Sequence, residues 1–551
     1  MNTLIRIMTL WCLLLLNTAY SYAEDVATPA TSAAVVAPAN DLPNLLGQLV
    51  TAEDFEQKAL IIQQLALRQE SQVLPILSAL LEGQLHYNMT QPSQLVIVAT
   101  EGDDPIVTDA LTAKPLGTVS QFTLDMVSVN NALRGELRTI IARLQLSSPD
   151  KSLRLAAAKQ LISNQPDSNL LPILEQQISQ ESASDVKALL TTVVGLVLSQ
   201  SEELSLRLQA IEKLTGSLYP EVSARLQEMA DNDADTTVKH KAQAALTKTQ
   251  QQIKAYQVAE NIFFGLSLGS VLLLAAVGLA ITFGVMGVIN MAHGELMMLG
   301  AYTTYVLQQL MPQHLGLSLV LSIPAAFIVA GLVGIAIERG VIRFLYGRPL
   351  ETLLATFGIS LILQQAVRSI FSPLNRAVAS PEWMSGSLEI NPVWSITYNR
   401  LYILLFALAV FFVLLVVLKR TALGLKLRAV AQNRAMARAV GVRADWMDAL
   451  TFGLGAGIAG IAGVALSQLT NVGPNLGQAY IIDSFLVVVF GGVGNLWGTL
   501  VGAFGLGIAN KFLEPYAGAV LAKVLVLVFI ILFIQKRPRG LFPQKGRAVE
   551  S

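Results

Sequence analysis

The residues with the most chemical potential in this chain lie in an uncharged stretch. Asn290, His293 and Glu295 stand within six residues of one another. Residues 261–292 carry no charge, and residues 296–337 carry none except a possible charge on a histidine. Polar groups at membrane depth are costly, so they are kept mainly where they face a bundle interior or a substrate path. The pattern predicts transport chemistry here, because one His and one Glu do not make a convincing catalytic set.

A second constellation joins a glycine cluster to an amide side chain. Gly491, Gly492 and Gly494 lie within four residues and are followed by Asn495. They predict a broken helix, since unwound backbone at membrane depth is tolerated only inside protein or along a cavity, and broken helices often build substrate sites. The candidate lining groups of a substrate path are Asn290, His293, Glu295, Gln364, Gln365 and Asn495. An open alternative is that His293 and Glu295 pair with each other or brace a helix end.

Charge divides the chain into two parts. Residues 24–257 contain 17 Lys/Arg and 27 Asp/Glu, whereas residues 258–551 contain 20 and 11. The first part is typical of a water-soluble, acidic domain and the second of a membrane-embedded domain with basic loops. We therefore expect an exported soluble domain at 24–257, a transmembrane domain at 258–540 and a tail at 541–551. Nothing in the sequence indicates a nucleic-acid partner.

The first 23 residues resemble a secretory signal peptide. A short apolar segment, Met8–Leu16, precedes the plausible cleavage site Ser21-Tyr22-Ala23. The alternative is an uncleaved anchor. The only cysteine, Cys12, lies in this segment, so the mature chain is expected to have no thiol for disulfides, metal ligation or nucleophilic catalysis. No metal or cofactor is expected.

The soluble part is predicted to be mainly helical after a flexible leader at 24–44. Residues 94–99 and 121–127 read as strands around a turn at 101–105. A hydrophobic–basic pair then recurs at spacings of 33, 20 and 32 residues, at Leu153-Arg154, Val186-Lys187, Leu206-Arg207 and Val238-Lys239. This resembles HEAT-type repeats, and an ordinary helical domain is the alternative. Either is expected to bind or scaffold.

Apolar segments of about 20 residues are needed to cross a bilayer as a helix. The candidates are 261–284, 291–310, 317–337, 352–371, 401–418, 449–468, 482–496, 499–512 and 519–535. The pair 482–496 and 499–512 is short and broken by glycines, so a re-entrant form is the alternative. The predicted fold class is therefore all-α: a polytopic membrane helix bundle of eight to ten spans after an exported, mainly helical domain. Recurrent glycines at four-residue spacing, such as Gly453 and Gly457, predict close helix packing.

Lysine and arginine predict the orientation of these spans. Basic residues gather at 338–351, 419–448 and 536–547, which are expected to be cytoplasmic. The alternate loops at 311–316, 372–400 and 469–481 are poor in positive charge. Nine crossings place the soluble domain outside and the tail inside, in agreement with a cleaved signal peptide.

The chain lacks a Gly-x-x-x-x-Gly-Lys-Ser/Thr phosphate loop, so ATP-driven transport requires the ATPase on another subunit. Short helices within 422–441 would then be the natural docking surface for the ATPase. The alternative is that their arginines only reflect the positive-inside rule for cytoplasmic loops. The candidate coupling residues are Arg428, Ala431, Arg434, Ala435, Arg438, Ala439 and Gly441.

Four motifs in order make residues 260–545 resemble the permease subunits of branched-chain amino acid ABC importers. They begin at Phe283, Leu427, Gly491 and Arg537, and include Phe-Gly-Val-Met-Gly-Val-Ile-Asn-Met-Ala-His-Gly-Glu and Arg-Pro-Arg-Gly-Leu-Phe-Pro. The long exported domain, and the stretch from Gln478 to Gly498 with Gly-Asn where amino acid permeases usually have Gly-Ser, resemble the urea branch of this family. The resemblance implies an inner-membrane protein that works with a second related permease, two ATP-binding subunits and a periplasmic solute-binding protein.

Urea import is accordingly the main functional hypothesis. Urea is uncharged and both donates and accepts hydrogen bonds, so amide, hydroxyl or carbonyl groups could pass it without a charged clamp. Import of a branched-chain amino acid or a short-chain amide is the alternative. A sensor or scaffold that transports nothing comes next, and an intramembrane hydrolase is remote.

Overall fold

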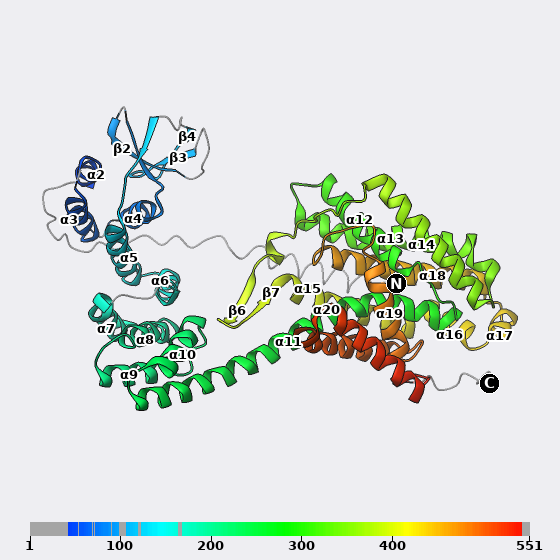
Figure 1. The fold of residues 1–551 in the computed structure, drawn as a ribbon. Helices are drawn as coiled ribbons and strands as arrows, with labels where there is room; N and C mark the ends of the chain where they lie inside the picture. Colours follow the sequence, from blue (N-terminus) through cyan, green and yellow to red (C-terminus); the bar gives the residue numbers. More distant parts are fainter. Residues whose placement is uncertain are drawn as a thin grey trace. The chain divides into compact units, whose positions relative to one another are not determined.

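The computed structural model describes residues 42–52, 54–68, 70, 72–89, 91–98, 106–118, 123–163 and 168–542 (Figure 1). The predicted signal peptide, most of the leader, the turn at 101–105 and residues 543–551 of the tail lie outside this part. The chain divides into two compact units. The first reaches residue 161 and takes in 172–187, and the second holds 162–171 and continues from 188. One helix, α11 (Thr236–Met286), runs through the predicted boundary at 257/258 without a break.

The first unit opens with helices packed on an antiparallel sheet. Its first helices are α2 (Leu42–Thr51), α3 (Phe55–Ala66), α4 (Val73–Glu82) and α5 (Asn131–Leu146). The strands are β1 (Leu85–Asn88), β2 (Gln91–Val98), β3 (Ile106–Asp109), β4 (Pro115–Thr118) and β5 (Leu124–Met126), in the order β4-β3-β2-β1-β5. The two predicted strands are confirmed as β2 and β5. Sequence patterns missed β1, β3 and β4, which are four residues long and hardly alternate in polarity.

Local signals explain where these helices begin. Asp54 Oδ1 accepts a hydrogen bond from the Glu56 amide at 3.3 Å and caps α3. Asn130 Oδ1 accepts one from the Leu133 amide at 2.8 Å and caps α5. Leucines and isoleucines on their inner faces, with those of α2 and α4, form one buried cluster against the sheet.

The helices that follow form two successive sets of three. The first set is α6 (Lys151–Ser163), α7 (Leu171–Gln180) and α8 (Ser184–Leu198), with a 3₁₀ turn at Ser168–Leu170. The second is α9 (Leu204–Leu214), α10 (Pro220–Asn232) and α11 (Thr236–Met286). The recurring pairs open α6, α8, α9 and α11, so the irregular spacings are those of a three-helix repeat rather than of helix pairs.

Each set carries the same arginine arrangement. In α6, Arg154 Nε donates to Glu181 Oε2 at 2.7 Å, and its Nη1 donates to two backbone carbonyls five and six residues earlier, both at 2.9 Å. In α9, Arg207 forms an ion pair with Asp233 at 3.0 Å. Its Nη1 also donates to the backbone carbonyls five and six residues earlier. Since both acids precede the third helix of their set, this arrangement fixes the turn before that helix.

The second unit contains the membrane helices. They are α11, α12 (His293–Leu310), α13 (Leu315–Gly340), α14 (Pro349–Phe371), α15 (Tyr398–Arg420), α18 (Ala444–Ser467), α19 (Gln478–Gly491) and α20 (Leu496–Lys536). Smaller elements connect them: 3₁₀ turns at Ile342–Leu345 and Glu382–Met384, the hairpin of β6 (Ser387–Asn391) and β7 (Trp394–Thr397), and the helices α16 (Ala422–Gln432) and α17 (Arg434–Ala439). The predicted class, a polytopic helical membrane bundle, is confirmed.

Six helices of the described residues are long and apolar enough to cross a membrane: α11, α13, α14, α15, α18 and α20. Of the nine predicted segments, 499–512 and 519–535 both fall on α20, whose helical geometry is interrupted at Gly518. Helices α12 and α19 are 18 and 14 residues long. The predicted span 291–310 thus falls on the first of these short helices, and 482–496, for which a re-entrant form was the alternative, falls mostly on the second.

The centre of the bundle is built from α11 and α18. The most apolar windows of these two helices are 78% and 89% buried, against 28–33% for α13, α14 and α15. Glycines allow the close approach, as predicted: a Cβ added to Gly278 of α11 would lie 2.5 Å from the Gly455 carbonyl oxygen of α18. A Cβ on Gly265 would lie 2.6 Å from the Ile508 Cα of α20.

Candidate functional site

The chain breaks between α11 and α12, where the first candidate residues lie. Gly287 ends α11 with a left-handed φ of 70°. Beyond it, Asn290 Oδ1 accepts a hydrogen bond from the Ala292 amide at 3.0 Å, and the Thr356 hydroxyl of α14 accepts one from the Met291 amide at 3.1 Å. Asn290 is buried, and its Nδ2 has no hydrogen-bond partner among the described residues. One end of this amide therefore orders the break while the other is left for a ligand or water.

His293 shows that α12 begins well inside the bundle. Its Nε2 lies 2.9 Å from the carbonyl oxygen of Ala275, and its ring is fully buried. Ala275 stands eleven residues before the end of α11, which corresponds to roughly 16 Å of helix. The segment after α11 thus turns back into the bundle before α12 starts. His293 Nδ1 has no partner within the described part of the chain.

Glu295 is held by an amide from another helix. Gln364 Nε2 of α14 donates to Glu295 Oε1 at 2.5 Å and lies 3.3 Å from the Ser360 hydroxyl. Glu295 and Gln364 are both buried. The alternative that His293 pairs with Glu295 is not what the structure shows, because each has another partner. Gln365 is exposed, so the structure does not bring this candidate into the buried group.

A second break meets the first. Residues 468–477 separate α18 from α19, and the last of them, Gly477, packs on the first turn of α12. A Cβ on Gly294 would lie 2.5 Å from the Gly477 carbonyl oxygen, and one on Gly477 would lie 2.8 Å from the Glu295 amide. Two short helices therefore begin at one place inside the bundle. We call this place, with Asn290, His293, Glu295, Gln364 and Gly477, the junction.

The junction combines helix starts with buried polar side chains. Helix N-termini carry partial positive charge and unpaired amides, which suit polar solute groups. Its free side-chain groups, Asn290 Nδ2 and His293 Nδ1, can bond a neutral molecule. The part played by Gly477 was not predicted. The available signal was a mostly apolar segment of 14 residues, too short to cross, that follows a Gly/Pro-containing loop.

The predicted break at the second glycine cluster is present but is occupied by other contacts. Gly492 and Gly494 have φ of 105° and 79° between α19 and α20. Asn495 Oδ1 accepts hydrogen bonds from the Trp497 and Gly498 amides at 3.1 and 3.2 Å, which caps α20. Its Nδ2 donates to the Phe542 carbonyl at 3.2 Å. Asn495 therefore acts as a helix cap tied to the tail, and the contacts of the described residues do not join it to the junction.

The candidate coupling segment forms two short helices, as predicted. Arg434 of α17 forms an ion pair with Asp448 and lies over the Tyr346 ring, 4.0 Å from its centroid. Arg438 pairs with Asp445 at 2.7 Å, while in α16 Arg428 Nη1 donates to the Leu418 carbonyl at 2.5 Å. These arginines therefore fasten α16 and α17 to the bundle. Gly441 has a left-handed φ of 88° just after α17.

This segment exposes apolar and basic side chains together. Leu425, Met436 and Val440 are 62%, 64% and 75% exposed. Ala435 and Ala439 are also exposed, and Ala431 is half-buried. Lys426, Arg428 and Arg438 are exposed beside them, and exposed apolar groups among polar ones are typical of a protein-binding surface.

The fold is that of a multi-pass membrane helix bundle. Comparison with known proteins agrees: residues 261–534 match the family described as branched-chain amino acid transport system / permease component. The high-affinity branched-chain amino acid transport system permease protein BraD of Pseudomonas aeruginosa is 30% identical over 295 residues, which cover 52% of this chain and 96% of that protein. LivH of Salmonella typhimurium, described in the same words, is 31% identical over 293 residues, 51% of this chain and 94% of its own. A probable branched-chain amino acid transport permease protein of Methanocaldococcus jannaschii is 25% identical over 291 residues, which cover 49% of this chain and 88% of that protein.

The chain belongs to the branched-chain amino acid transport permease family. No solved structure matches it. The family match begins at residue 261, so the sheet and the helical repeats before it lie outside the matched region.

Proposed function

We propose that this chain is a permease subunit of an ATP-driven importer and that it moves a small uncharged polar solute, urea in the first place, across the inner membrane. The main support for this proposal is the junction, where buried hydrogen-bonding groups lie at the starts of two short helices. Its one acidic group, Glu295, is already bonded by Gln364. The groups left for a solute are uncharged amide and imidazole nitrogens and helix-start amides, which suit a molecule that needs no charged clamp.

The second candidate substrate is a branched-chain amino acid, and the comparisons favour it. All the relatives above are named for branched-chain amino acid transport, and none is named for urea. What supports urea instead is the part of the chain before residue 261, which the family match does not cover. A short-chain amide fits the same uncharged groups and belongs with urea in chemistry.

The partners follow from the proposed mechanism. A second, related permease completes the path, two ATP-binding subunits dock on the exposed surface of α16 and α17, and a solute-binding protein delivers the solute from the periplasm. The ion pairs of Arg434 and Arg438 with α18 residues Asp448 and Asp445 would transmit movement of the ATPases to the central helix. ATP is consumed on those subunits and not by this chain. The soluble domain is periplasmic and the tail cytoplasmic.

The test is labelled urea uptake at micromolar concentration in cells with and without this gene, with excess leucine and acetamide as competitors. Gene-dependent uptake that leucine leaves unchanged supports urea. Uptake blocked by leucine, or leucine uptake alone, moves the function to amino acid import. Absence of flux for either solute, with the ATP-binding subunits present, supports the sensor or scaffold instead.

A further inference from the structure

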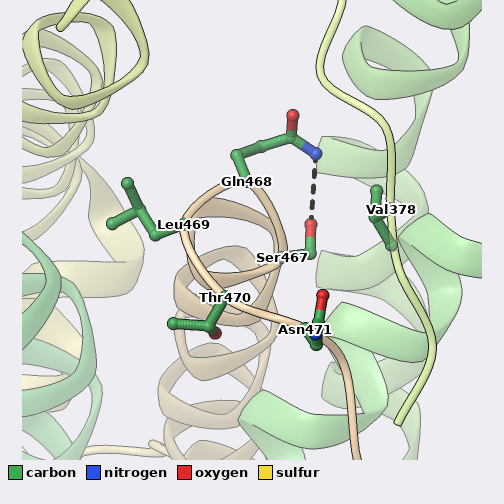
Figure 2. A pocket seen from close by; sticks show the side chains of 6 residues that line it. All are labelled: Val378, Ser467, Gln468, Leu469, Thr470 and Asn471. Carbon is green, nitrogen blue, oxygen red and sulfur yellow. Dashed lines mark hydrogen bonds between the residues drawn. The ribbon is translucent and has the colours of Figure 1, made fainter.

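A pocket lies where α18 ends, apart from the candidate residues chosen from sequence. Its volume is about 330 Å³ and its lining residues are Val378, Ser467, Gln468, Leu469, Thr470 and Asn471 (Figure 2). None of the six is ionisable, and four carry a hydroxyl or an amide. The volume is at the lower end of the range for ligand pockets, which suits a solute of few atoms.

The two walls of the pocket are fixed to each other. Arg376 and Val472 form an isolated antiparallel bridge, with N–H···O distances of 2.7 and 2.8 Å. Gln308 of α12 bonds both backbone groups of Ala379 at 2.9 Å, next to Val378. These bonds hold the two loops, both in segments predicted to lie outside, so the pocket is a built feature rather than a gap between mobile loops.

Gln468 is the group in this pocket that lacks a partner. Its side chain is 6% exposed. The Nε2 atom lies 3.3 Å from the Ser467 hydroxyl, as Figure 2 shows, whereas Oε1 has no hydrogen-bond partner among the residues described. A buried acceptor left unpaired costs about 1–3 kcal/mol, which a ligand or water that donates a hydrogen bond would recover. Either orientation of this amide leaves one polar atom unpaired.

The pocket and the junction share one segment of the chain. The segment that begins with Gln468 ends at Gly477, which contacts Gly294 at the start of α12. A solute held at Gln468 therefore lies on the same ten-residue segment that forms one side of the junction.

We propose that this pocket is an outer solute-binding site for a small uncharged molecule with an amide-like donor and acceptor, occupied before the solute reaches the junction. The amides of Gln468 and Asn471 and the hydroxyls of Ser467 and Thr470 supply the hydrogen bonds to the solute. The absence of an ionisable group from the lining selects against an amino acid zwitterion. This inference rests on the proposed function, since it assigns the solute class of the same importer.

The first test uses one introduced cysteine as the only thiol of the chain. Thr470→Cys is introduced together with Cys12→Ser, and labelling by a membrane-impermeant thiol reagent is followed in the assembled importer with urea, acetamide or leucine added. We expect urea and acetamide to slow labelling at least threefold and leucine to leave the rate unchanged. Labelling that no solute slows, or that leucine slows instead, would overturn the proposed site.

The second test separates the pocket from the function of the whole importer. Gln468→Met removes the hydrogen-bonding end at similar size, and Gln313→Met makes the same change at an exposed position in the loop 311–316. We expect Gln468→Met to raise the KM for urea at least fivefold with a smaller effect on kcat, and Gln313→Met to change neither. An unchanged KM in a transporting protein contradicts the pocket alone. If the unmodified importer carries leucine and not urea, the proposed substrate fails as well.

Discussion

Two side chains of the junction are bonded to the protein through one polar end only. Asn290 Oδ1 orders the break before α12, and its Nδ2 has no partner among the described residues. His293 Nε2 bonds a carbonyl of α11, and its Nδ1 has no partner in the same part of the chain. The sequence predicted these residues from their isolation among apolar neighbours. It could not predict which end of each is free, because that depends on helices distant along the chain.

Replacing Asn290 tests its place on the path. Asn290→Leu removes the free donor, so uptake is expected to fall at least tenfold without loss of membrane protein. Asn290→Asp keeps the acceptor that orders the break but lacks the donor, so uptake by this variant is expected to fall by a similar factor. Transport assays with quantified membrane protein measure both. Unchanged uptake in Asn290→Leu would remove this residue from the path.

Replacing Gln364 tests the bond that holds Glu295. Gln364→Leu leaves a buried carboxyl without its partner, which is expected to cost about 1–3 kcal/mol and to lower the thermal stability of the solubilised protein. The neighbouring Gln365→Leu is the matched control, since its side chain is exposed and a change within about 0.5 kcal/mol is expected. Equal melting temperatures for the two variants would contradict the assigned role of Gln364.

At the scale of elements, sequence reasoning located the helices but did not predict how deep in the bundle each helix starts. The segments 291–310 and 482–496 were predicted as spans from apolar content. In the structure α12 and α19 are short and meet through Gly294 and Gly477. Hydrophobic periodicity indicates which face of a helix is apolar. It does not indicate that the chain breaks before α12 and before α19 contact each other. Likewise, the glycines before Asn495 predicted a break correctly, but the cap it forms on α20 needs the tail to be in place.

The three-helix repeat gives a pH-dependent prediction. The Arg154 guanidinium holds the pKa of the Glu181 carboxyl below its ordinary value, chiefly through their hydrogen bonds. The resulting stabilisation is therefore full above the ordinary carboxyl pKa of about 4.3 and is lost as pH falls through the lowered native pKa.

Glu181→Gln is expected to lower the unfolding temperature of the soluble part at pH 7 by a few degrees. This deficit should shrink below about pH 4, where the wild-type carboxyl loses its charge. Scanning calorimetry of the solubilised chain measures both. A deficit of the same size at every pH would show that charge on Glu181 is not its cause.

At the scale of the whole molecule, α11 joins the soluble repeats to the membrane bundle. It runs for 51 residues, from the third helix of the second repeat to the break before Asn290. Composition located the change from soluble to membrane-embedded sequence within this helix, but a change of composition does not show whether the backbone is continuous.

The predicted orientation can be checked with single cysteines in a Cys12→Ser background. Ser205→Cys in the soluble domain is expected to react nearly completely with a membrane-impermeant thiol reagent on intact spheroplasts. Lys426→Cys in α16 is expected to react only after the membrane is opened. Both positions are exposed, so access to the compartment decides the result. The reverse pattern would invert the topology and with it the proposed docking of the ATPases.

The most direct test of the account is transport by the purified importer in proteoliposomes, with both permeases, the ATP-binding subunits and the solute-binding protein. The account predicts ATP-dependent accumulation of labelled urea, competed by acetamide and not by leucine, that falls at least tenfold in Asn290→Leu. Accumulation of leucine alone would contradict the proposed substrate while leaving the permease assignment in place. Urea uptake that does not need ATP, or that Asn290→Leu leaves unchanged, would contradict the mechanism built on the junction.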